Sequence, residues 1–95
     1  MIVIISDRAE RDFATQIQWL HDRSPKAGER AARRILDVID LLEQFPDLGE
    51  RLRGTIREKH VKFGKDGFVI RYRRGETTII VMRIFHSRQD RPGFP

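Results

Sequence analysis

Two short apolar runs near the end of the chain, residues 68–74 and 79–85, constrain the fold more than any other feature. Both are rich in β-branched and aromatic residues, and the turn-forming sequence Arg74-Gly75-Glu76 separates them. They therefore predict the central hairpin of a β-sheet. Arginines interrupt both runs. Because a solvated sheet face has no particular need for arginine, these residues indicate an acidic partner.

Alternation along the first run divides its side chains between two faces of the predicted sheet. Arg71 and Arg73 share one face, which is cationic and points away from the core. Arg83 joins that face if the register of the hairpin allows it. The apolar members of the first run share the core face: Phe68, Ile70 and Tyr72.

The first quarter of the chain predicts a strand followed by a helix. Residues 2–5 are apolar on both faces, which predicts a strand buried within or beside the sheet. Asp7 is predicted to cap the helix, with Glu10 completing a capping box. Trp19 lies beside the apolar stripe, either at the edge of the core or as an exposed aromatic. The stripe itself consists of Ala9, Phe13, Ile17 and Leu20.

A second helix follows at once. Ser24 as a cap and Pro25 at the first helical position predict its start. Pro46 ends it about twenty residues later, because proline disfavours helix at the preceding residue and donates no hydrogen bond. The two helices form an antiparallel hairpin whose apolar side needs a sheet to cover. The stripe of the second helix consists of Ala31, Ile35, Val38, Leu42 and Phe45.

The remaining segments complete one domain, residues 1–95. Residues 50–54 predict a charged loop, and residues 56–63 a poorer strand. The Asp66-Gly67 pair predicts the turn of the hairpin that follows. Residues 91–95 contain two prolines and predict an irregular tail. The order β-α-α-β-β-β predicts an α+β fold, with a helical hairpin on one face of a mainly antiparallel sheet.

Composition and charge exclude several classes of function. The chain has no cysteine, so neither a disulfide nor a thiolate metal site is expected. The apolar run at residues 1–5 is short and has no basic residues before it, so a signal peptide is not expected. No segment has the length of a membrane span, so a cytoplasmic protein is expected. The three histidines are scattered and no phosphate-binding loop occurs, so neither metal nor cofactor is expected.

The charge is unevenly distributed along the chain. The first 50 residues carry 7 Lys/Arg against 10 Asp/Glu, a net charge of −3, and the last 45 carry 12 against 4, a net charge of +8. The cationic strand face continues into a polar cluster at the strand end, where His86, Arg88 and Gln89 lie. Such a surface can hold RNA phosphates or an acidic protein. His86 is either a general acid or base, or a surface residue with a purely hydrogen-bonding role.

The layout resembles the toxins of RelE/ParE type II toxin–antitoxin modules, across nearly the whole chain. Each shared motif is short, and it is their order and spacing together that are specific. The ending resembles the His-Gly-Arg-Arg/Gln sequence of the ParE branch. In order, the motifs are Ala9-x-x-Asp12-Phe13, Pro25-x-Ala27, Phe45-Pro46-x-Leu48-Gly49, Gly67-Phe68-x-Ile70-x-Tyr72-Arg73 and Arg83-Ile84-Phe85-His86-Ser87-Arg88-Gln89.

This resemblance implies a growth-inhibiting toxin that an antitoxin neutralises, and the branch decides the target. ParE-like toxins act on DNA gyrase without being nucleases, whereas RelE-like toxins cut mRNA in the ribosome. Of the residues that the RelE-like pattern implies, Lys62 and Arg88 are present. His60 replaces a lysine, Val69 an arginine, and Phe94 a tyrosine. Without that arginine and that phenol, phosphate stabilisation and proton transfer are lost.

The sequence therefore favours a non-enzymatic, ParE-like toxin that binds DNA gyrase and forms a hetero-oligomer with a ParD-like antitoxin. The alternative is a ribosome-dependent mRNA endonuclease whose partners are the ribosome and mRNA. In that alternative, the catalytic residues are drawn from Glu58, Arg73, His86 and Arg88. In the favoured reading, the target-binding residues are Arg71, Arg73, Arg83, His86, Arg88 and Gln89.

Overall fold

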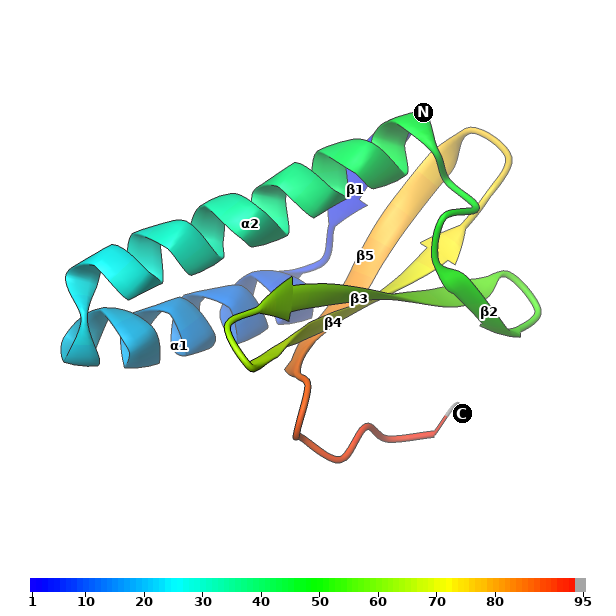
Figure 1. Ribbon diagram of the computed structural model, residues 1–95. Coiled ribbons are helices and arrows are strands. Elements are labelled where there is room, and N and C mark those ends of the chain that lie inside the picture. Colours follow the sequence, from blue (N-terminus) through cyan, green and yellow to red (C-terminus); the bar gives the residue numbers. More distant parts are fainter. Residues whose placement is uncertain (94–95) are drawn as a thin grey trace.

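The computed structural model describes residues 1–93. A two-helix hairpin covers one face of a five-stranded sheet (Figure 1). The sheet has the strand order β1-β5-β4-β3-β2, with β1 parallel to β5 and the other neighbours antiparallel. This confirms the predicted α+β fold. In chain order the elements are β1 (Ile2–Ile5), α1 (Asp7–Arg23), α2 (Pro25–Gln44), β2 (Glu50–Arg53), β3 (Ile56–Phe63), β4 (Asp66–Arg74) and β5 (Thr78–His86).

The core lies between the helices and the sheet, as the two apolar stripes predict. Tyr72 is the largest buried side chain, and its hydroxyl donates to the Pro46 carbonyl at 2.7 Å and accepts from the Gly49 N–H at 2.9 Å. These bonds tie the loop after α2 to the middle of β4, and burial raises the pKa of Tyr72. The buried members of the core are Ala9, Ala31, Ile35, Val38, Ile39, Leu42, Val61, Phe68, Ile70, Tyr72, Ile79, Val81 and Ile84.

Both helix starts show side-chain caps. Ser24 caps α2 and Pro25 occupies its first position, as predicted. The predicted cap of α1 is wrong, because Ser6 and not Asp7 accepts from the Ala9 N–H, at 3.1 Å. Asp7 is the first residue within the helix, where its negative charge favours the helix N-terminus.

Three further predictions about the strands need correction. Residues 50–53 form β2, because they pair with the start of β3 instead of looping freely. The β3–β4 turn is Gly64-Lys65 and not Asp66-Gly67. Gly64 has φ +61°, a conformation that glycine adopts without strain. β1 lies at the sheet edge, and Ile2 and Ile4 are exposed on one of its faces.

Phe45 is also more exposed than its place in the predicted stripe of α2 implies. It is the C-cap of α2, where the chain already turns away from the helix axis towards Pro46. Among residues 1–93, no helix is long and apolar enough to cross a membrane.

Candidate functional site

The predicted site residues divide between the two faces of the sheet. Arg71 and Arg73 point away from the helices, as alternation predicts, on what is called here the outer face. A register shift between Arg71 and Tyr72 leaves Arg83 directly opposite Arg71, so Arg83 joins this face. His86 lies opposite Phe68 and is therefore on the face that the helices cover. The structure thus separates His86 from the three arginines.

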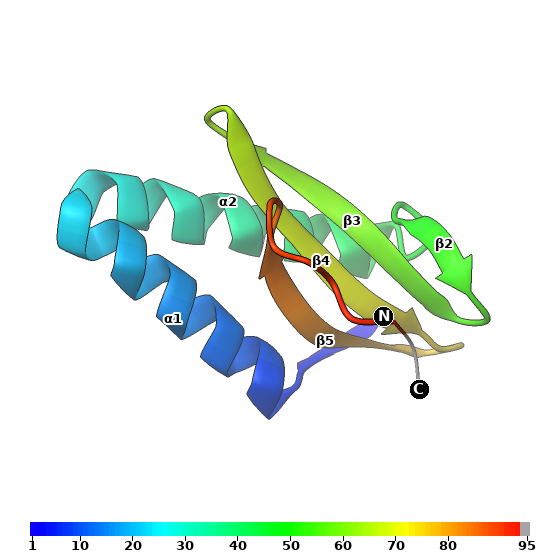
Figure 2. The same ribbon diagram turned by 90° about the horizontal axis from the view of Figure 1, so that it is seen from below.

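The C-terminal segment, residues 87–93, crosses the outer face and closes its centre (Figure 2). Val69 and Phe85, which face each other on β4 and β5, are fully buried although no helix covers this side. Two contacts hold the segment in place. Arg71 Nη1 donates to the Pro92 carbonyl at 2.8 Å, and Arg91 Nε donates to Glu58 Oε1 at 3.1 Å.

Arg71 is buried, which corrects the expectation of a solvent-facing cation. Only 7% of Arg71 and 3% of Glu58 is exposed. Glu58 stands directly opposite Arg71 on β3, and Arg71 Nε donates to Glu58 Oε2 at 2.9 Å. The Arg71 guanidinium also lies 5.1 Å from the Phe85 ring centroid. These internal partners, together with Pro92, compete with any external ligand for Arg71.

Arg83 is likewise held by an internal carboxylate. Its Nε and Nη2 donate to Asp12 at 2.8 and 3.3 Å, and the Ile84 N–H donates to the same carboxylate at 2.9 Å. Burial raises the pKa of Asp12, but these hydrogen bonds outweigh it and the net pKa is lowered. Gln16 donates to the Ile84 carbonyl at 2.6 Å. Side chains of α1 thus close the edge of β5 beyond the end of β1.

Arg73 differs from its neighbours on the outer face. It stands opposite Ile56 on β3 and Ile80 on β5, beyond the part of the face that the C-terminal segment crosses, and it is exposed. None of the hydrogen bonds or ion pairs found within residues 1–93 uses its side chain. Arg73 is therefore available to a partner.

A groove of about 600 Å³ opens on the other side of the sheet, between α1, the β3–β4 turn and the end of β5. It is called here the α1 groove. Apolar side chains form its walls, and charged side chains with His86 stand around them. Its lining residues are Thr15, Gln16, Trp19, Leu20, Phe63, Gly64, Lys65, Asp66, Gly67, Phe68, His86 and Arg88.

His86 is fixed at one end of the groove. Its ring meets the Phe68 ring edge-on, with centroids 6.2 Å apart, and its Nδ1 accepts from the Arg88 N–H at 3.1 Å. The His86 N–H donates to Gln89 Oε1 at 3.2 Å. Arg88 Nε donates to Asp66 Oδ1 at 2.8 Å, yet 69% of the Arg88 side chain is exposed. His86 therefore has a hydrogen-bonding role in the turn, while Arg88 presents charge to solvent.

Trp19 is the exposed aromatic of the two alternatives that the sequence leaves open. It is 55% exposed, and the Arg23 guanidinium lies 3.6 Å from its ring centroid. Trp19, Phe63 and Lys65 were not predicted as site residues. Trp19 gave one signal, since it falls one position off the apolar stripe of α1. The other residues gave none, because the walls of the groove come from elements far apart in the chain.

The residues of the alternative nuclease set are not brought together. Glu58 pairs with Arg71, while Arg73 stands two positions further along the same strand. His86 and Arg88 lie at the groove, on the other side of the sheet. Among residues 1–93, no three carboxylate or imidazole side chains cluster closely enough to hold a metal ion.

Comparison with known proteins identifies the family. The family model described as "ParE toxin of type II toxin-antitoxin system, parDE" matches residues 3–91. The chain belongs to this family. Two relatives from Caulobacter vibrioides are similar over almost their whole length. Toxin RelE3 is 38% identical and Toxin RelE1 37% identical, each over 94% of this chain, and the matches cover 97% and 96% of those proteins.

A solved structure of the "Chromosomal ParDE TA system from P. aeruginosa" has the same fold. It matches with a TM-score of 0.73 at 17% sequence identity, over 90% of this chain and 95% of that one. The chain is thus a toxin of a type II toxin–antitoxin module, in a family whose relatives carry both ParE and RelE names.

The positions that a RelE-like nuclease implies can now be located in this ParE-family chain. His60 and Lys62 are exposed on β3, with side chains on the outer face. Val69 is buried beneath the C-terminal segment, so this position does not reach a ligand. Arg88 stands at the α1 groove. Phe94 lies outside the described residues.

Proposed function

We propose that this toxin inhibits growth by binding DNA gyrase, without cutting RNA. The closed outer face carries the proposal. Its buried carboxylate, Glu58, is engaged by Arg71 and Arg91, and Val69 stands where the resemblance places a phosphate-binding arginine. A general acid or base must reach the proton that it transfers, and a buried, doubly paired carboxylate does not. Gyrase works in the cytoplasm, which is where we place the toxin.

The proposed target surface consists of the exposed cations. Arg88 and Gln89 at the end of β5, with His86 beside them, present polar groups to solvent at the α1 groove. Arg73 adds an exposed cation on the outer face. Arg71 and Arg83 support this surface indirectly, because their internal ion pairs hold β4 and β5 in place.

We propose further that a ParD-like antitoxin places an extended or helical segment in the α1 groove. Trp19, Leu20 and Phe63 offer apolar walls, and Lys65 and Arg88 offer charge. This arrangement fits a segment that carries apolar anchors and acidic residues. A segment bound there covers His86 and Arg88, so one contact both forms the hetero-oligomer and hides part of the target surface.

The RelE names of the two Caulobacter vibrioides relatives favour one alternative, a ribosome-dependent mRNA endonuclease. Two assays with purified toxin separate the two functions. We expect gyrase supercoiling to be inhibited and mRNA on translating ribosomes to stay intact. Unaffected supercoiling with cleaved mRNA would overturn the proposal. His86→Ala should leave toxicity within about threefold, because a non-catalytic histidine supplies no proton-transfer step, which is typically worth at least about a hundredfold.

The antitoxin part has its own test. Co-expression with the product of the neighbouring small open reading frame should yield a stable complex that Trp19→Ala weakens. Absence of any complex would contradict the toxin–antitoxin reading of this chain, whatever the target assays show.

A further inference from the structure

Strand β3 has an open edge that is distinct from the α1 groove. β2 pairs with the start of β3 only, as far as Glu58, so the end of the strand, residues 59–63, has a strand neighbour on one side alone within residues 1–93. An open strand edge presents backbone donors and acceptors to any chain that arrives in extended form.

The hydrogen-bond pattern identifies the free groups. The Arg74 N–H donates to the Thr55 carbonyl at 2.8 Å, which fixes the alternation of the β3–β4 ladder. By that alternation, the backbone groups of His60 and Lys62 point away from β4, towards the open edge. Arg34 Nε donates to the Lys62 carbonyl, at a long 3.4 Å. Within residues 1–93, the His60 N–H, the His60 carbonyl and the Lys62 N–H then have no strand partner.

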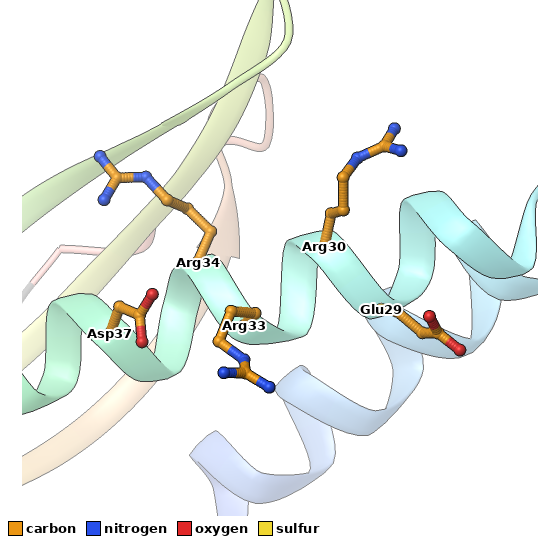
Figure 3. Close-up of a pocket in the computed structure, with 5 residues that line it drawn as sticks. All are labelled: Glu29, Arg30, Arg33, Arg34 and Asp37. Carbon is orange, nitrogen blue, oxygen red and sulfur yellow. The ribbon is translucent and has the colours of Figure 1, made fainter.

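One arginine of α2, Arg34, contacts this edge, and Arg30 lies one helical turn from it. In Figure 3, Arg34 reaches towards the strands and Arg30 extends from the same side of α2, whereas the Arg33 side chain points away from the strands, towards α1. All three arginines border a shallow hollow of about 350 Å³ that Glu29 and Asp37 also line. None of the ion pairs found within residues 1–93 neutralises Arg30 or Arg34.

The charge order of α2 does not serve the helix itself. Basic residues occupy its first half, and its last turn contains none, which opposes the helix dipole. Lys62 and Lys65 add positive charge along β3 and the turn. A second copy of this chain would bring the same cations to the edge and be repelled, so the charge selects an acidic partner.

The opposite edge of the sheet, on the β1 side, lacks this combination. The open side of β1 carries the uncharged residues Ile2 and Ile4, which offer nothing to a carboxylate. Beyond β1, the edge of β5 is closed by Asp12 and Gln16. Open backbone groups and unneutralised arginines therefore coincide at β3.

We propose that an acidic, extended segment of a partner protein adds to the edge of β3 as a further strand. Its backbone pairs with His60 and Lys62, and its carboxylates accept hydrogen bonds from Arg30 and Arg34, while Arg34 leaves the Lys62 carbonyl to the incoming N–H. Main-chain pairing then supplies affinity, and the arginines supply the preference for acidic side chains.

The test uses ¹⁵N-labelled toxin and an eight-residue peptide of alternating Glu and Val. We expect the largest amide shifts at His60, Val61 and Lys62, with the His60 and Lys62 amides newly protected from exchange. The same peptide with every second backbone nitrogen methylated keeps its charge but cannot pair as a strand, and should bind at least about tenfold more weakly. Equal binding of both peptides would overturn strand addition.

Charge-reversal variants locate the arginine contribution. Arg30→Glu and Arg34→Glu should each lower the affinity for the Glu–Val peptide by about tenfold, since each removes a charge-assisted contact. Arg33→Glu changes the net charge equally, but the Arg33 side chain points away from the strands, so this variant should change affinity less than about twofold. A uniform loss in all three variants, or shifts centred on β1, would mean non-specific attraction to a basic protein and would overturn the proposal.

Discussion

The two faces of the sheet use their charged residues in opposite ways. On the outer face, Arg71 is paired with Glu58 and bonded to the C-terminal segment, so the centre of this face is closed, and Arg73 is exposed beyond it. At the α1 groove, Arg88 is paired with Asp66 but is still mostly exposed, beside apolar walls that no other part of residues 1–93 covers. A run of arginines therefore indicates a binding surface only when the internal partners of those arginines are known.

The largest effect should come from removing the ring beneath the C-terminal segment. Phe85 is fully buried, so Phe85→Ala is expected to lower the free energy of unfolding by about 4 kcal/mol, measured by urea denaturation. Leu36→Ala, on the exposed side of α2, should cost less than about 1 kcal/mol. If the two variants cost the same, the outer face is not closed and the comparison between the faces fails.

The buried ion pair should give the next largest effect. Glu58→Leu leaves the Arg71 guanidinium buried without its carboxylate, which is expected to cost about 3 kcal/mol of stability. Arg73→Leu is the matched control on the neighbouring strand, because Arg73 is exposed, and it should stay within about 0.5 kcal/mol of the parent protein. Equal unfolding temperatures of the two variants would show that the buried Arg71 guanidinium does not need the Glu58 carboxylate for stability.

A smaller, pH-dependent effect is expected where α1 closes the edge of β5. Asp12→Asn removes the charge that Arg83 contacts and should cost about 1 kcal/mol at neutral pH. The folded-state pKa of Asp12 is lowered, so its contribution to stability is present above the ordinary aspartate pKa of 3.8 and is lost as the pH falls through the folded-state pKa. The stability difference between parent and variant should therefore shrink below pH 3.8. A difference that grows on acidification would contradict this assignment.

The smallest stability effect is expected in the groove, at Trp19. It is about half exposed, so Trp19→Ala should cost less than about 1 kcal/mol of stability. The same change should weaken antitoxin binding at least about tenfold, since aromatic anchors dominate such interfaces. Isothermal titration with the purified antitoxin measures this. Unchanged affinity would move the antitoxin away from the α1 groove.

Local pattern predicted the helices, their apolar stripes and the three long strands, because each depends on neighbours within a few residues. Short-range competition explains the misses there: Ser6 outcompetes Asp7 as a cap, and Gly64 takes the turn because it tolerates a positive φ. The burial of Arg71 could not be predicted from local sequence pattern. It depends on Glu58 lying opposite on another strand and on Pro92 crossing the sheet.

The proposed target surface was predicted only in part for the same reason. Arg88 and Gln89 follow a recognisable strand end, whereas the walls of the α1 groove combine α1, the β3–β4 turn and β5. Arg83 shows most clearly why local pattern could not place every site residue. Its face depended on a register shift after Arg71, and its partner Asp12 lies at the other end of the chain.

One pair of charge reversals tests most directly whether the open groove end, and not the outer face, is the main contact with the target. Arg88→Glu and Arg73→Glu change the charge equally, and both side chains are exposed. In a gyrase supercoiling assay, we predict that Arg88→Glu raises the toxin concentration needed for half-inhibition at least about tenfold, while Arg73→Glu changes it less than about threefold. The reverse order would contradict the account and assign target binding to the outer face.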